Sequence, residues 1–187
     1  MTKINDLYNI INQILKTYKK IDILVNNAGI NITKPALEIE ESDWDKVLDT
    51  NLKSLFFISK FIAKNMIEQS KGKIVNMASQ VGFVGYFNRS SYASSKGGVI
   101  QLTKTLAIEW ADNNINVNAV APTFVETDLT KNMLQSPEFT EDILNRILFH
   151  KMPKADDISN TVLFLSSDLS DFITGETIKV DGGWTAI

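Results

Sequence analysis

Hydrophobic residues recur every three or four positions at the start of the chain and predict an amphipathic helix there. Apolar side chains from Ile4 to Tyr18 fall on one face of this helix, with polar residues between them. The short apolar run from Ile21 to Val25 follows and is typical of a strand buried on both faces. Asn26-Asn27-Ala28-Gly29 then ends the strand with residues that favour a turn.

A long helix and a second strand are predicted next. Ser42 has the character of an N-cap, and Asp45 lies three positions later, close to a capping-box pattern. The helical spacing continues to about Gln69. Gly72 is expected to stop this helix, and the apolar run from Lys73 to Ala78 predicts the second strand.

The second half of the chain continues the alternation of helix and strand. Residues 122–137 are expected to be mostly irregular. The other elements expected here are a helix from Tyr92 to Ala111, a strand from Ile115 to Ala121, short helices near Leu129 and from Glu138 to Phe149, a helix from Asp156 to Ser166, and a strand from Thr177 to Val180.

Apolar strands that alternate with helices predict an α/β fold, a Rossmann-like parallel sheet with helices on both faces. Four strands are few for such a fold, so we expect residues 1–187 to form a single, partial Rossmann-like domain, truncated to about four strands. The strand from Ile21 to Val25 has the composition of an interior strand. At the edge of the sheet it would expose apolar side chains and unpaired backbone, so another segment ought to cover it.

Composition and charge narrow the range of functions. Of the 187 residues, 44% are hydrophobic and 22% charged, which is typical of a folded globular domain. The formal net charge of −3 comes without a basic cluster, so no nucleic-acid partner is expected. No apolar run approaches the ~18–20 residues of a membrane span, and the first residues lack the order of a signal peptide. We therefore expect a cytosolic protein with no membrane partner.

The chain lacks the side chains that several kinds of catalytic site require. It has no cysteine and a single histidine, His150. Disulfides, thiolate metal sites and cysteine nucleophiles are therefore excluded. With one histidine and no cysteine, the chain has few of the side chains that a Ser-His-Asp triad or a transition-metal site needs. No metal is expected.

Tyr92 and Lys96 are the first candidates for chemistry. They are four positions apart on a predicted helix, so their side chains share a face. A free tyrosine has a pKa of about 10 and is a poor base at neutral pH, but a nearby ammonium stabilises the phenolate and lowers that pKa. The alternative is a surface tyrosine beside a solvated lysine, and this short motif alone is too common to decide between them.

Three further positions carry polar groups at places where a ligand could bind. Ser79 closes the second strand, at the sheet edge where parallel sheets place active sites, although a loop serine is the simpler reading. Asn51 lies within a helix, where it either holds a water or a backbone group or faces solvent. The turn at residues 26–29 either lets backbone approach a ligand or merely ends the strand.

Taken together, these motifs resemble the short-chain dehydrogenase/reductase family over nearly the whole chain. The Asn-Asn-Ala-Gly turn, Asn51 in TNLKS, Ser79 in NMAS, and Tyr92 with Lys96 in SYASSK come in the family's order. Ser79 and Tyr92 are 13 positions apart, which is the family's usual interval. The segment TGETIKVDGG also looks like the family's last strand. Each motif is weak alone, but their ordered occurrence is highly specific.

The resemblance implies an NAD- or NADP-dependent oxidoreductase that interconverts a secondary alcohol and a ketone. Tyr92 would exchange a proton with the substrate oxygen, and Ser79 would hydrogen-bond that oxygen. Lys96 would lower the pKa of Tyr92 and bind the nicotinamide ribose. Asn51 would hold a water in a proton relay. The cofactor-binding positions implied are Asn26, Ala28, Gly29, Tyr92, Lys96, Pro122, Val125 and Thr127. The Trp184 ending and the Pro122 turn are similar to relatives that act on sugar acids and polyols.

One departure from the family pattern follows the third strand. The family usually has Pro-Gly there, whereas Pro122 is followed by Thr123. Threonine adopts a positive φ less easily than glycine, so we expect this turn to differ slightly.

A second departure concerns the glycine-rich turn that grips the cofactor pyrophosphate. Relatives open with a strand, a Thr-Gly-x-x-x-Gly-x-Gly turn and a helix. None of the nine glycines here has that spacing, and none precedes Gly29. By resemblance, three strands and two helices are expected to be absent, on the order of 60 residues.

This departure leaves two functions open. The first is an oxidoreductase whose missing strands come from a separate chain or from an upstream start. The second is a cofactor-incompetent remnant that acts only as a binding or oligomerisation partner. A Rossmann-like methyltransferase is not favoured, because it would need a glycine loop and would leave the Ser-Tyr-Lys set unexplained. We expect a homo-oligomer in either case.

For these 187 residues we expect no measurable binding of NAD(H) or NADP(H) at micromolar cofactor, because the residues that contact the pyrophosphate are missing. Calorimetric titration measures this directly. A saturable isotherm would show that the remaining contacts suffice.

Overall fold

The computed structural model describes residues 3–127 and 130–186, and its four strands form one parallel sheet. The strand order is β1-β2-β3-β4, so each strand pairs with the next one along the chain. This confirms the predicted α/β fold with a parallel sheet. The strands are β1 (Ile23–Asn26), β2 (Gly72–Met77), β3 (Ile115–Pro122) and β4 (Thr177–Val180).

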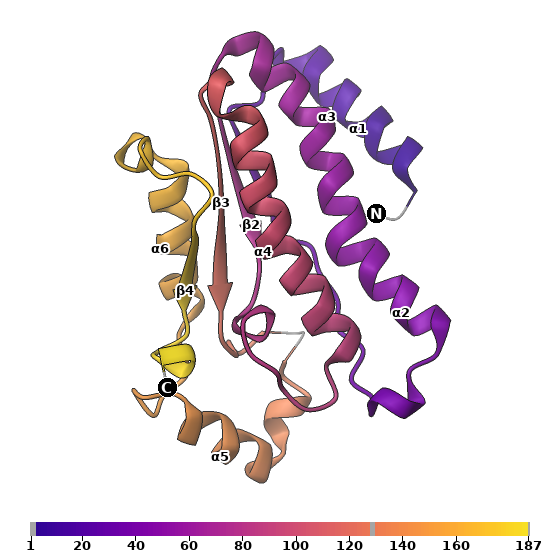
Figure 1. Cartoon of the computed structure of the whole chain (residues 1–187), viewed down its shortest axis with the longest axis vertical. Helices are drawn as coiled ribbons and strands as arrows, with labels where there is room; N and C mark the ends of the chain where they lie inside the picture. Colours follow the sequence, from indigo (N-terminus) through magenta and orange to yellow (C-terminus); the bar gives the residue numbers. More distant parts are fainter. Residues whose placement is uncertain (1–2, 128–129, 187) are drawn as a thin grey trace.

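Helices cover both faces of the sheet (Figure 1). The helices are α1 (Ile4–Tyr18), α2 (Glu41–Leu48), α3 (Ser54–Gln69), α4 (Ser90–Trp110), α5 (Pro137–Arg146) and α6 (Ala155–Ser166). Helices α3 and α4 pack on one face, α1 packs outside α3, and α6 covers the other face. Helix α5 lies beyond the carboxyl ends of the strands (Figure 1). Short 3-10 turns occur at Ala36–Glu38, Gln80–Gly82, Ala111–Asn113, Met133–Gln135, Asp168–Ser170 and Trp184–Ala186. None of the helices in the described ranges is long and apolar enough to cross a membrane.

Most predicted elements are present, with small shifts at their ends. The first helix and the last strand have the predicted bounds. The strand expected at residues 21–25 covers Ile23–Asn26, and the helix expected at 138–149 ends three residues early, at Arg146. The short helix expected near Leu129 falls on a position outside the described residues.

The predicted N-cap and stop residue of the long helix are wrong, whereas its predicted end at about Gln69 is confirmed. The helix begins at Glu41, so Ser42 lies in its first turn, and Glu40 is the N-cap. The backbone N–H of Glu40 donates to Asp43 Oδ2 at 3.3 Å, the reciprocal half of a capping box. The helix ends at Gln69, and its C-cap Ser70 has a left-handed φ of 51°. Gly72 is instead the first residue of β2.

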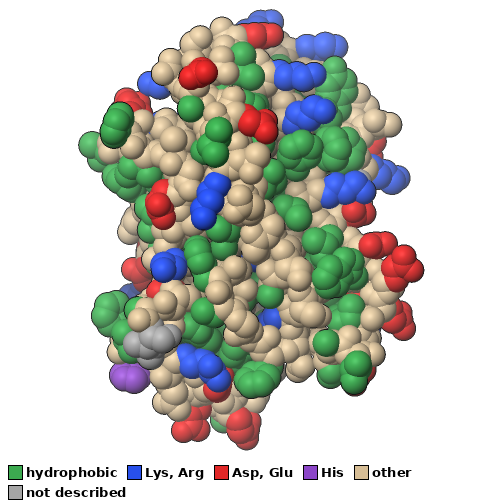
Figure 2. Space-filling view, in the orientation of Figure 1, with side chains coloured by type: hydrophobic (Ala, Val, Ile, Leu, Met, Phe, Trp, Pro, Cys, Tyr) green, Lys and Arg blue, Asp and Glu red, His purple; other side chains and the backbone are tan. Residues whose placement is uncertain are grey.

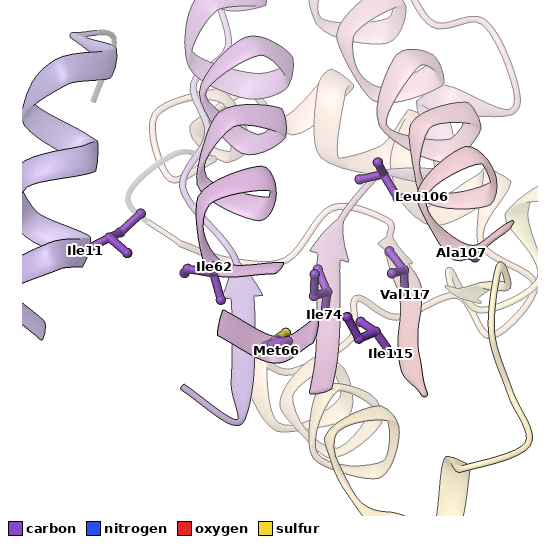
Figure 3. Close-up of a cluster of buried hydrophobic side chains, with 8 residues drawn as sticks. All are labelled: Ile11, Ile62, Met66, Ile74, Leu106, Ala107, Ile115 and Val117. Atoms are coloured by element: carbon purple, nitrogen blue, oxygen red, sulfur yellow. The ribbon is translucent and has the colours of Figure 1, made fainter. Parts of the chain in front are cut away.

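Side chains from both the helices and the sheet meet in a buried apolar cluster (Figure 3). Ile11 of α1 and Ile62 of α3 approach it from one side, and Leu106 of α4 from the other. Ile74 of β2 and Val117 of β3 supply the sheet face beneath them. This packing fixes α4 against the sheet and therefore fixes the side chains at its first turns.

Strand β1 lies at the edge of the sheet, as considered above. Its Ile23 and Val25 side chains are 46% and 40% exposed. Within residues 3–127 and 130–186, no strand pairs with its outer side. Strand β1 therefore has the apolar composition of an interior strand, although it lies at the edge of this sheet.

We predict that Leu106→Ala lowers the free energy of unfolding by about 2–5 kcal/mol, because it opens a cavity in the buried cluster. Leu163→Ala is the matched control on α6, where the side chain is 67% exposed. It should change the free energy by less than about 0.5 kcal/mol. Urea unfolding measures both, and equal effects would contradict the packing described here.

Candidate active site

A cavity of about 680 Å³ opens at the carboxyl ends of β1, β2 and β3. Its volume is within the range of small-molecule sites, ~300–1,000 Å³, and the carboxyl edge of a parallel sheet is where such sites form. Its wall includes Ser79 after β2, Tyr92 and Lys96 of α4, Pro122 at the end of β3, and Ile158 of α6. Three of the four residues predicted to be catalytic, Ser79, Tyr92 and Lys96, therefore line one cavity.

Lys96 joins α4 to the end of β2. Its Nζ donates to the carbonyl oxygen of Met77 at 2.6 Å, and the side chain is only 5% exposed. The same Nζ lies 5.6 Å from the centre of the Tyr92 ring. Burial lowers the pKa of Lys96 to about 8. The lysine therefore stays mostly charged at neutral pH but loses its proton at a lower pH than an exposed lysine does.

The pKa of Tyr92 departs from the expectation stated above. Burial raises it, while the nearby Ser79 hydroxyl and the positive charge of Arg89 act in the opposite direction. The effect of Lys96 on this pKa stays a prediction. Its ammonium donates to the Met77 carbonyl and lies 5.6 Å from the centre of the Tyr92 ring.

Ser79 lies directly after β2, in extended backbone, and is 7% exposed. Its hydroxyl donates to Gln80 Oε1 at 2.8 Å and lies 3.5 Å from the carbonyl oxygen of Pro122. A hydroxyl can rotate to exchange one partner for another. Ser79 can therefore turn from Gln80 toward a ligand without moving its backbone.

Asn51 lies in a π-helical turn, Asp49–Lys53, between α2 and α3. Its Nδ2 donates to the Ile30 carbonyl at 2.9 Å and to Ser95 Oγ at 3.0 Å, and its Oδ1 accepts from the Ile30 N–H at 2.8 Å. The alternative that this side chain holds a backbone group is therefore confirmed. Asn51 does not line the cavity itself; it fixes the loop after β1 against α4.

Some residues of the turn at 26–29 line the cavity, and others do not. Asn26 is buried, and its Nδ2 donates to Ser59 Oγ at 2.9 Å and to Asn76 Oδ1 at 2.8 Å. Neither Asn26 nor Ala28 lines the cavity, whereas Asn27 and Gly29 do. The structure therefore does not bring two of the predicted cofactor positions to the site, since the side chain of Asn26 faces the protein interior.

The backbone of Gly29 runs beside two of the candidate residues. A Cβ atom at this position would lie 3.4 Å from Asn51 Oδ1 and 3.6 Å from Lys96 Nζ. A bound molecule that reaches Lys96 must therefore pass close to this stretch of main chain. Glycine leaves the approach open.

The segment after β3 lines the cavity at Pro122, Val125 and Thr127, as predicted. Thr123 has no positive φ, so the turn does not need the usual glycine. Its hydroxyl is buried and has no hydrogen-bond partner among the residues described. A buried hydroxyl in a cavity wall is normally satisfied, so this one is available to a ligand.

Several lining residues were not predicted from the sequence. Arg89 lies one helical turn before Tyr92, and its proximity to the SYASSK motif was the available signal. Other lining residues reach the cavity only through folding, such as Ser159 of α6, and no local pattern marks them. Across the two described ranges, no group of His, Cys, Asp and Glu side chains could hold a metal ion.

Comparison with known proteins extends the similarity over the whole chain. A family model described as enoyl-(acyl carrier protein) reductase matches residues 1–185. The chain is 41% identical to 2-dehydro-3-deoxy-D-gluconate 5-dehydrogenase of Escherichia coli (strain K12), over 100% of this chain and 74% of that protein. It is 40% identical to a 3-oxoacyl-(acyl-carrier-protein) reductase of Thermotoga maritima, over 98% of this chain and 74% of that protein.

A solved structure agrees with these relatives. Gluconate 5-dehydrogenase from Burkholderia cenocepacia J2315, in complex with NADP and tartrate, matches with a TM-score of 0.97 and 32% identity. The match covers 100% of this chain and 73% of that one. The chain belongs to the short-chain dehydrogenase/reductase family, and it spans about three quarters of the length of these relatives. The expected lack of a glycine-rich segment stays a prediction.

We predict that the stability of the protein depends on pH through Lys96. Its folded pKa of about 8 lies below the ordinary value, so the unfolded chain binds more protons above pH 8 and stability rises with pH. Relative to Lys96→Met, the wild type should gain about 2 kcal/mol between about pH 7 and about pH 9.5. Urea unfolding at the two pH values measures this difference.

Lys20→Met is the control, because it removes an ammonium from an exposed site at the opposite end of the sheet. It should show no comparable change with pH relative to the wild type. A Lys96→Met difference that is the same at both pH values would contradict the buried, weakly basic lysine.

Proposed function

We propose that this chain is the catalytic part of an NAD(P)-dependent oxidoreductase that interconverts a secondary alcohol and a ketone. The observation that carries the proposal is the position of Ser79, Tyr92 and Lys96 on the wall of one cavity at the carboxyl edge of the sheet. Membership of the family supports an enzyme over a remnant that only binds a partner. Residues 1–187 then act as one partial Rossmann-like unit.

Each of these side chains has a role that its surroundings support. Ser79 donates a hydrogen bond to the substrate oxygen once its hydroxyl turns away from Gln80. Tyr92 accepts the proton of the alcohol in oxidation and returns one to the ketone oxygen in reduction. Arg89 and Ser79 both favour the phenolate, so they help Tyr92 to act as the base. Asn51 keeps one Oδ1 lone pair free of protein donors, which a relay water would use.

The described residues fit a nicotinamide cofactor. Lys96 gives one of its three N–H donors to Met77, so two remain for the hydroxyls of a ribose beside Gly29. Thr123 supplies an unpartnered hydroxyl, and Pro122, Val125 and Thr127 complete that wall. When bound, the nicotinamide accepts or supplies the hydride. No glycine-rich turn with the family's spacing occurs in these 187 residues.

The substrate proposed is a sugar acid or a related polyol. The Escherichia coli relative is named for a deoxy sugar acid, and the Burkholderia structure holds tartrate, a hydroxy acid. The cavity volume of about 680 Å³ is large enough for such a molecule together with the nicotinamide half of the cofactor.

We also propose that the chain self-associates. Apolar side chains gather on the face made by α3 and α4 (Figure 2), and Ile108 of α4 is 80% exposed there. A shallow apolar hollow beside it is lined by Leu52, Phe56 and Leu102. Contiguous apolar surface of this kind marks protein interfaces. A separate chain that pairs with the open side of β1 is the alternative partner, and analytical ultracentrifugation of the purified chain distinguishes a monomer from a homo-oligomer.

We predict that Tyr92→Phe lowers turnover at millimolar cofactor by at least about 100-fold, because it removes the group that exchanges the proton. Tyr18→Phe removes the same hydroxyl from a side chain that is 71% exposed and should leave turnover unchanged. Absorbance of the reduced nicotinamide measures both, and circular dichroism checks that each variant is folded. Retained turnover in folded Tyr92→Phe would remove Tyr92 from its proposed role.

A further inference from the structure

Arg89 is a buried cation on the wall of the cavity. It occupies the N-cap position of α4 and is only 3% exposed. Within residues 3–127 and 130–186, no carboxylate forms an ion pair with it. The chain's other arginine, Arg146, pairs with Asp142 at 2.9 Å on the protein surface. Burying a charged group without a counter-charge is costly, so this position calls for an explanation.

The contacts of the Arg89 guanidinium leave much of its hydrogen-bonding capacity unused. Nη1 donates to Thr33 Oγ1, and Nη2 lies 3.0 Å from the sulfur of Met133, a weak acceptor. The guanidinium carbon lies 5.9 Å from the centre of the Phe124 ring. Arginine has five N–H donors, so these contacts satisfy a minority of them. Burial lowers the pKa of Arg89, and an anion beside it would relieve that cost.

The place of Arg89 relates it directly to the reacting group. It precedes Tyr92 by three positions at the start of α4, and its charge acts on the Tyr92 phenol. Both side chains line the cavity. A substrate whose oxygen meets Tyr92 would therefore extend its far end past the guanidinium. Arginine binds carboxylates with two parallel hydrogen bonds, which also fix the orientation of the bound molecule.

We propose that Arg89 binds the carboxylate of the substrate and makes the site selective for hydroxy acids and oxo acids over neutral polyols. This inference rests on the proposed function and adds the residue that sets its specificity. The guanidinium touches the far end of the substrate, while Ser79 and Tyr92 act on the oxygen. Loss of Arg89 therefore affects binding of acids without removing the proton-exchanging group.

The test compares gluconate with glucitol, which has a hydroxymethyl group in place of the carboxylate. Calorimetric titration of the full chain, with and without millimolar NADP, gives the affinity for each. Arg89→Gln should weaken gluconate binding and raise its KM by about 10- to 100-fold, the usual effect of losing a hydrogen bond to a charged group. Glucitol binding and NADP affinity should change little, whereas kcat should fall to a similar extent for gluconate and glucitol, because Arg89 also favours the Tyr92 phenolate. Arg89→Lys keeps the charge and should recover part of the loss.

The exposed substitution Lys20→Gln removes one positive charge at the opposite end of the sheet and controls for net charge. Three results would overturn the inference. Arg89→Gln could lose equal affinity for gluconate and glucitol, it could lose affinity for NADP, or the wild type could bind gluconate no more tightly than glucitol. If Arg89→Gln does not fold, full gluconate affinity in folded Arg89→Lys and Arg89→Met together would also overturn it. Hydride transfer that survives in Tyr92→Phe defeats the proposed function instead, and leaves the carboxylate selectivity to be judged on binding alone.

Discussion

The bond from Lys96 Nζ to the Met77 carbonyl is the contact on which the site depends. It ties the second turn of α4 to the last residue of β2, at the place where the strand gives way to Ser79. Because Tyr92 is one turn before Lys96 on the same helix, this contact sets where the phenol lies relative to the Ser79 hydroxyl. Apolar packing of α4 on the sheet stabilises the helix there, and the Lys96 hydrogen bond fixes its position along the sheet relative to the end of β2.

The site concentrates positive charge in a poorly solvated place. Lys96 and Arg89 are both almost fully buried, and neither has a carboxylate partner in the part of the chain that the structure describes. Two desolvated cations cost stability, and the charge of Arg89 favours the anionic form of a neighbouring group, such as the Tyr92 phenolate or a bound carboxylate. Reduced stability in exchange for a prepared site is common where chemistry takes place.

The fold and the cavity-lining positions of Ser79 and Tyr92 could be predicted, because both leave local patterns in the sequence. Strand runs, helix periodicity and the SYASSK motif are short-range signals, and they gave the sheet and the positions of Ser79 and Tyr92. The direction in which a side chain points is a tertiary property. Asn26 faces the interior because Ser59 and Asn76, distant in sequence, offer it partners. The burial of Arg89 in the cavity wall is likewise a tertiary property, and the spacing of residues along the sequence does not predict it.

The π turn at Asp49–Lys53 sets the direction in which the Asn51 side chain points from the long helix. Such a turn contains one residue more than an α-turn needs, and one residue corresponds to a rotation of about 100°. Removing a single residue upstream would regularise the helix and swing the Asn51 amide away from Ile30 and Ser95. Point substitutions around Asn51 keep this alignment, whereas a one-residue deletion cannot. Length in this segment is therefore under a stricter constraint than amino-acid identity.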